Sequence, residues 1–71
     1  MTERQKEFLR ALKMLGLSMT ALICIGTLIR SEDDMMEFSR RLIELEDRGV
    51  SVAEAQALQT LLEMMKEVSE I

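Results

Sequence analysis

An uncharged run of sixteen residues, from Met14 to Ile29, constrains the fold of this chain more than any other stretch. Lys13 precedes the run and Arg30 follows it. The run is shorter than the about 20 apolar residues that cross a membrane, and it is too apolar to face water along its whole length. Other parts of the chain, or a second chain, must therefore cover it.

The composition indicates one small helical domain of limited stability. The chain has 71 residues, 48% of them hydrophobic, with no proline, tryptophan or tyrosine. A chain of this size buries only about 60% of the surface that its unfolded form exposes. The single cysteine, Cys24, excludes an intrachain disulfide, and the lack of histidine excludes ordinary zinc sites. Self-association is the remaining source of stability, and we expect residues 1–71 to form a single helical domain.

Capping signals and glycines divide the chain into four expected helices. Four serine or threonine residues stand where a side-chain oxygen can cap a helix start: Thr2, Ser18, Ser31 and Ser51. Gly16 and Gly49 stand where a helix can end in the left-handed conformation. These signals predict helices at about residues 3–15, 18–30, 32–48 and 51–70.

The second of these helices is apolar almost all round. Only Thr20 and Thr27 share a modestly polar side. A helix without a polar face is usually a buried one. The expected fold is therefore all-α, a compact bundle of four short helices with a buried central second helix that the other three cover.

The fourth helix carries two apolar rows that lie side by side. One row holds Ala57, Leu61, Met64, Val68 and Ile71, and the other holds Ala55, Leu58, Leu62 and Met65. Together they span roughly 200° of the helix, more than the ~100° that one core requires. We therefore predict a homodimer formed by the fourth helix and part of the third. The predicted interface residues, chosen because they lie off the row that best suits the core, are Met36, Ile43, Leu61, Met64, Val68 and Ile71.

Two adjacent methionine pairs, Met35 with Met36 and Met64 with Met65, support a second surface. Adjacent residues on a helix cannot both point into one core, so one methionine of each pair should face elsewhere. Methionine side chains repack easily against varied partners. The pairs thus favour an interaction surface as well as a core.

Charge is divided unevenly between the two parts of the chain. Residues 1–30 hold five basic and two acidic residues, a balance of +3, while residues 31–71 hold four basic and eleven acidic residues, a balance of −7. Opposite signs favour pairing between the two parts, within a chain or between chains. The net charge of −4 argues against general affinity for nucleic acid.

The residues that enzymes and metal sites require are missing or poorly placed. Cys24 lies within the apolar run without a flanking Lys or Arg to lower its pKa, so we expect a buried, inert thiol. The carboxylates fall on the solvent-facing sides of helices, and no glycine-rich calcium loop accompanies them. We expect no enzyme activity, no cofactor and no metal.

Two other classes of function remain as alternatives. Residues 14–29 could anchor the chain to a membrane behind a basic N-terminal segment, although Gly16 and Ser18 shorten the continuous apolar helix. The turn at residues 15–18 also resembles the helix-turn-helix of DNA-binding regulators. Its second helix, however, has no Arg, Lys, Asn or Gln before Arg30 to contact base edges.

The function that these patterns favour is protein–protein interaction. We expect a small, cytoplasmic, non-enzymatic interaction or regulatory module that presents an apolar helical surface, as a homodimer, to an unidentified protein partner.

Overall fold

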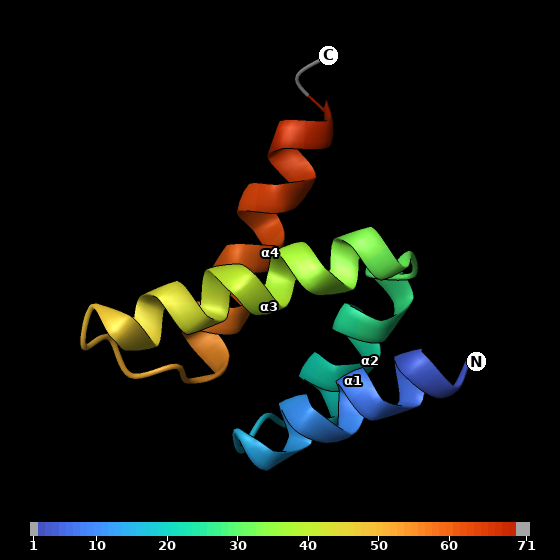
Figure 1. The fold of residues 1–71 in the computed structure, drawn as a ribbon, viewed down its shortest axis with the longest axis horizontal. Coiled ribbons are helices and arrows are strands. Elements are labelled where there is room, and N and C mark those ends of the chain that lie inside the picture. The colour runs from blue at the N-terminus through green and yellow to red at the C-terminus, as the bar shows by residue number, and fades with distance from the viewer. Residues whose placement is uncertain (1, 70–71) are drawn as a thin grey trace.

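The computed structural model describes residues 2–69, except for the side chains of residues 68 and 69. Over this range the chain is all-helical and contains no strand (Figure 1). The four helices are α1 (Glu3–Met14), α2 (Met19–Leu28), α3 (Glu32–Asp47) and α4 (Glu54–Ser69). The expected all-α bundle of four short helices is confirmed.

Local capping interactions begin the first three helices. The side-chain oxygens of Thr2, Ser18 and Ser31 each accept the backbone N–H three residues later, at 3.1 to 3.2 Å. Gly16 and Gly49, after α1 and α3, have φ of 86° and 81°. A residue with a Cβ rarely adopts this left-handed conformation, which explains glycine at both ends.

The fourth helix begins later than the sequence predicts. Residues 51–53 lie outside any helix, and the first turn of α4 closes where the Ala57 N–H donates to the Ala53 carbonyl at 3.0 Å. The prediction that Ser51 caps this helix is therefore wrong. Glu54 instead accepts a hydrogen bond from the Ser18 hydroxyl at 2.9 Å, which joins the starts of α4 and α2.

The helices form a ring around one core. α1 packs on α2 and α3, and α4 packs on the same two helices, so the order around the ring is α1, α2, α4, α3. Phe38 and Ile25 are fully buried at its centre, and the ring of Phe8 meets Phe38 edge-on at 5.9 Å between centroids. The buried apolar residues are Leu12, Leu17, Ala21, Leu22, Ile25, Ile29, Met35, Phe38, Leu42, Ala57, Leu61 and Met64.

Polar contacts at the surface join neighbouring helices of the ring. Arg4 of α1 pairs with Glu32 of α3 at 3.0 Å, and Arg41 of α3 pairs with Glu67 of α4 at 2.6 Å. Exposed pairs of this kind contribute about 0 to 1 kcal/mol each. They fix how the helices meet, while the buried side chains supply most of the stability.

Candidate protein-interaction surface

The second helix buries only one of its faces. Ala21, Leu22 and Ile25 point into the core with at most 7% of their surface exposed, whereas Met19 and Ile23 are 63% and 62% exposed. The reason is geometric: each helix of a four-membered ring has an outer side, and α2 packs against α1 and α4 only. The expectation of a second helix buried on all sides is therefore not met. We call the exposed residues Met19, Thr20, Ile23, Cys24 and Thr27 the outer face of α2.

A groove of about 690 Å³ lies between α1 and this side of α2. Its apolar lining comes from Leu9 of α1 and from Met19, Leu22 and Ile23 of α2. The two helices approach closely at Gly26, where an added Cβ would lie 3.3 Å from the methyl groups of Leu9. A larger residue at position 26 would therefore push Leu9 aside. We call this groove the α1/α2 groove.

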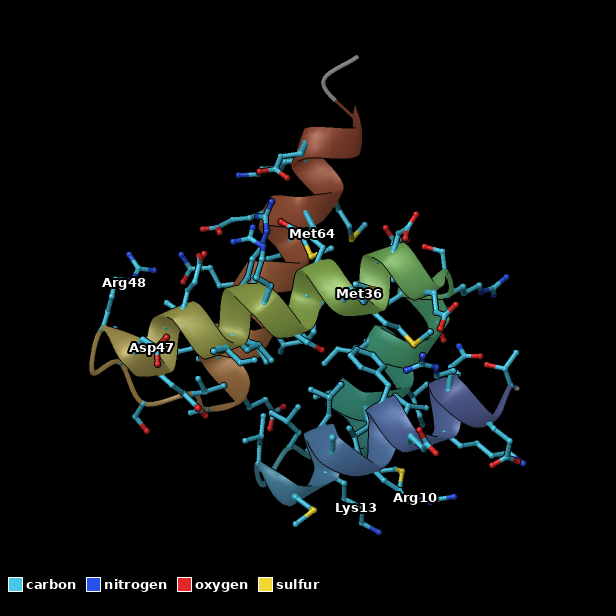
Figure 2. The ribbon with its side chains drawn as sticks, in the orientation of Figure 1. Arg10, Lys13, Met36, Asp47, Arg48 and Met64 are labelled. Carbon is cyan, nitrogen blue, oxygen red and sulfur yellow. The ribbon has the colours of Figure 1, made fainter. Side chains whose placement is uncertain are left out.

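Basic side chains line the edge of the α1/α2 groove. Lys6, Arg10 and Lys13 follow one another at spacings of four and three along α1, which places them on one side of that helix, and Arg30 lies just beyond α2. Figure 2 shows Arg10 and Lys13 at the edge of the molecule that α1 forms, away from α4. Lys6 lies 3.6 Å from Glu3. Among the side chains that the structure describes, no carboxylate pairs with Arg10 or Lys13.

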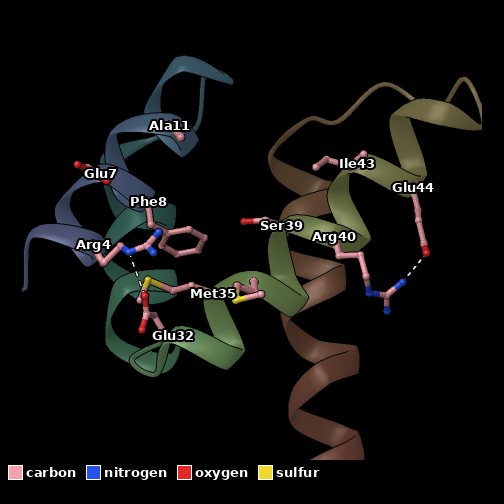
Figure 3. Close-up of a pocket in the computed structure, with 11 residues that line it drawn as sticks. Arg4, Glu7, Phe8, Ala11, Glu32, Met35, Ser39, Arg40, Ile43 and Glu44 are labelled. Carbon is pink, nitrogen blue, oxygen red and sulfur yellow. Dashed lines mark hydrogen bonds and ion pairs between the residues drawn. The ribbon is translucent and has the colours of Figure 1, made fainter.

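A second apolar groove, between α1 and α3, contains two of the predicted interface residues (Figure 3). Met36 and Ile43 of α3 are 69% and 57% exposed, and Phe8 contributes from α1. Four of the five charged residues of this groove form ion pairs, Arg4 with Glu32 near one end and Arg40 with Glu44 near the other, and Glu7 is the fifth. This α1/α3 groove has no unpaired row of one sign, in contrast to the α1/α2 groove.

The other predicted interface residues lie elsewhere. Leu61 and Met64 of α4 are 3% and 8% exposed and belong to the core, so the inference that their row lies off the core is wrong. The row facing outward is the other one, where Leu62 is 58% exposed. The side chain of Val68 and the whole of Ile71 lie outside the described residues.

The methionine pairs divide as the sequence predicts. Met35 is 7% exposed beside Met36 at 69%, and Met64 is 8% exposed beside Met65 at 41%. One methionine of each pair thus lies in the core and the other lies at the surface, which confirms the expectation that adjacent methionines do not both point into the core.

A third groove, of about 400 Å³, lies where the end of α2 meets α3 and α4. Leu28 and Met65 supply exposed apolar surface there, and the charged residues around it are acidic: Asp34, Glu37 and Glu67. Glu37 and Glu67 both pair with Arg41, and none of the residues of the outer face of α2 lines this groove.

Glu37, Arg40 and Arg41 form an ion cluster on the surface of α3. Hydrogen bonds from Arg40 and Arg41, at 2.6 and 2.9 Å, lower the pKa of the Glu37 carboxyl to about 2. The same contacts raise the pKa of both arginines. Arg41 also reaches Glu67, so this cluster connects α3 with α4. Each charge of this cluster has a partner, so the cluster joins α3 to α4 at the surface rather than forming a reactive site.

Three expectations about single features can be compared with the part of the chain that the structure describes. No three carboxylate or cysteine side chains gather there closely enough to hold a metal ion. Cys24 is exposed on the outer face of α2, so the prediction of a buried thiol is wrong. No helix within residues 2–69 has the length and hydrophobicity needed to span a membrane.

Comparison with known proteins assigns no family to the chain. It matches no protein-family model, no curated protein and no solved structure. The candidate functional features of the chain are therefore its own exposed surfaces, the outer face of α2 and the α1/α2 and α1/α3 grooves.

Proposed function

We propose that this chain is a non-enzymatic protein-interaction module that binds partners through exposed apolar helical surfaces. The observation that carries the proposal is the outer face of α2, where Met19 and Ile23 stay more than half exposed on a helix that contains no charged residue. Contiguous apolar surface of this kind on a small domain usually marks a binding site. A cytoplasmic location remains part of the proposal.

Self-association is assigned to the α1/α3 groove, with Met36 and Ile43 as its contact residues. A two-fold interface brings the same patch of two subunits together, so it favours patches whose charges are already balanced. The ion pairs Arg4–Glu32 and Arg40–Glu44 neutralise four of the five charged residues of this groove. The unpaired cations of the α1/α2 groove would instead meet their own copies, which would cost free energy. We therefore assign the α1/α2 groove to a different protein.

Sedimentation equilibrium with two matched double variants tests this assignment. Met36→Glu with Ile43→Glu alters side chains that are 69% and 57% exposed, and Met19→Glu with Ile23→Glu alters side chains that are 63% and 62% exposed. Because all four lie at the surface, neither variant should unfold the chain, which circular dichroism checks. We expect the wild type to be dimeric and only the α3 variant to be monomeric.

The other outcomes of this experiment are equally informative. Loss of the dimer only in the α2 variant would show that a second copy covers α2, and the assignment of the two surfaces would be wrong. A wild-type chain that is monomeric at all concentrations would refute the homodimer but would leave the α2 surface free for a partner.

The membrane and DNA alternatives find less support than protein binding. α2 has ten residues, and its inner face already packs in the core, so inserting residues 14–29 into a bilayer would require the bundle to open. For DNA binding, the outer face of α2 offers only methionine, isoleucine, cysteine and threonine side chains. None of these forms the bidentate contacts with base edges that arginine, asparagine or glutamine form.

A further inference from the structure

The α1/α2 groove combines an apolar lining with basic side chains along one edge. We infer that it binds an acidic amphipathic helix of a partner protein, an inference that rests on the proposed function and names the partner class of that site. The apolar face of such a helix would pack against Met19, Leu22 and Ile23, and its acidic residues would face Lys6, Arg10 and Lys13.

The spacing of the residues suits a helix. Met19, Ile23 and Thr27 recur every four residues along α2, and Lys6, Arg10 and Lys13 span eight residues of α1. At 1.5 Å per residue, the basic row is roughly 10 Å long, or about two helical turns. A partner helix of two to three turns would therefore contact the apolar row and the basic row at the same time.

The charges specify that the ligand is acidic. Arg10 and Lys13 are exposed and pair with no carboxylate among the side chains described, so their pairing capacity is free for a ligand. The ammonium group of Lys6 forms an ion pair with the Glu3 carboxylate at the long distance of 3.6 Å. A partner carboxylate placed beside these groups would gain charge-assisted hydrogen bonds, whereas a basic partner would be repelled.

The surroundings of α2 favour a helix over an anionic membrane surface. A flat surface that touched the outer face of α2 would not enter the groove between α1 and α2, where Leu9 and Leu22 form part of the apolar lining. A single helix can lie in this groove and face its basic edge.

Fluorescence anisotropy with synthetic peptides tests this inference. The probes are labelled 18-residue helices with Leu, Ile or Phe along one face and Glu along the flanks, and the controls carry Lys in place of every Glu. We expect the Glu peptides to bind with affinities that fall as salt is raised, and the Lys peptides to bind at least about tenfold more weakly.

Charge-neutralised variants locate the binding site. Arg10→Gln with Lys13→Gln should weaken binding of the Glu peptides roughly 2- to 30-fold. Arg48→Gln with Lys66→Gln removes the same charge from the residue after α3 and from α4, away from the groove, and should change the affinity less than about twofold. Equal effects of the two variants would show a non-local charge effect and would overturn the inference.

Further outcomes separate this inference from the proposed function. If no Glu peptide binds up to about 1 mM, or if the Lys peptides bind as well, the groove does not select acidic helices and the inference fails. If vesicles of phosphatidylglycerol bind the chain while the Glu peptides do not, the surface serves a membrane and both proposals fail. If the peptides fail but the chain dimerises through Met36 and Ile43, only the inference fails.

Discussion

Replacing the two isoleucines of α2 by alanine, one at a time, compares its inner and outer faces. Ile25 is 0% exposed at the centre of the core, and Ile23, two residues earlier on the same helix, is 62% exposed. Both substitutions are chemically identical and both exchange a β-branched residue for alanine within a helix, so the change in helix propensity cancels in the comparison. The remaining difference reports burial.

The expected magnitudes differ widely. Ile25→Ala removes buried methyl and methylene groups and leaves a cavity, which costs about 2 to 5 kcal/mol. Ile23→Ala removes groups that are mostly in contact with water, so its effect should lie within about 0.5 kcal/mol. A chain of this length has a free energy of unfolding of about 4 to 11 kcal/mol, so the first substitution removes a large part of it.

Urea denaturation followed by circular dichroism measures both changes. The measurement is repeated at chain concentrations that differ by about 100-fold, because dimerisation makes stability depend on concentration. The reasoning is refuted if Ile23→Ala destabilises the dilute chain as much as Ile25→Ala does. An effect of Ile23→Ala that appears only at high concentration would show that a second copy covers the outer face of α2.

Three further predictions follow from single residues. Leu61→Asp should unfold the chain because it buries a carboxylate, and Leu62→Asp should leave the circular dichroism spectrum unchanged; similar spectra for both would contradict their placement. Ser31→Ala removes the cap of α3 and should cost about 0.5 to 2 kcal/mol in thermal unfolding, whereas Ser51→Ala should cost almost nothing. The pKa of Glu37 is about 2 in the folded chain and 4.5 ordinarily, so its stabilising effect is complete above pH 4.5 and is lost as the pH falls toward 2. Wild type should therefore lose more stability than Glu37→Gln across that window, and parallel pH profiles would contradict the ion cluster.

Signals that act within a few residues predicted much of the fold. The capping residues Thr2, Ser18 and Ser31 and the glycines Gly16 and Gly49 lie where the sequence placed them, because a cap depends only on the backbone next to it. Ser51 has the same local pattern, but α4 starts at Glu54. There the Glu54 carboxylate bonds to the start of α2, a tertiary contact that no local pattern contains.

The candidate site could not be located in the same way. The fourth helix has two apolar rows of similar strength, and only the positions of α2 and α3 decide that Leu61 and Met64 are buried while Leu62 is exposed. The only polar signal in α2 comes from Thr20 and Thr27, which lie on the outer face but are too few to show that the apolar residues beside them meet water. The basic row along α1 was visible as an excess of charge, but its position beside an apolar groove depends on how α1 packs against α2.

The accessibility of Cys24 tests most directly whether the outer face of α2 is open in the single chain. The rate of thiol modification by an aromatic disulfide reagent is measured on dilute, monomeric chain and compared with the rate in urea. Cys24 is exposed, so the native rate should lie within about tenfold of the unfolded rate. Native protection of roughly 1000-fold or more, as expected if the thiol reacts only after global unfolding, would show that α2 is covered on all sides and would contradict the proposed surface.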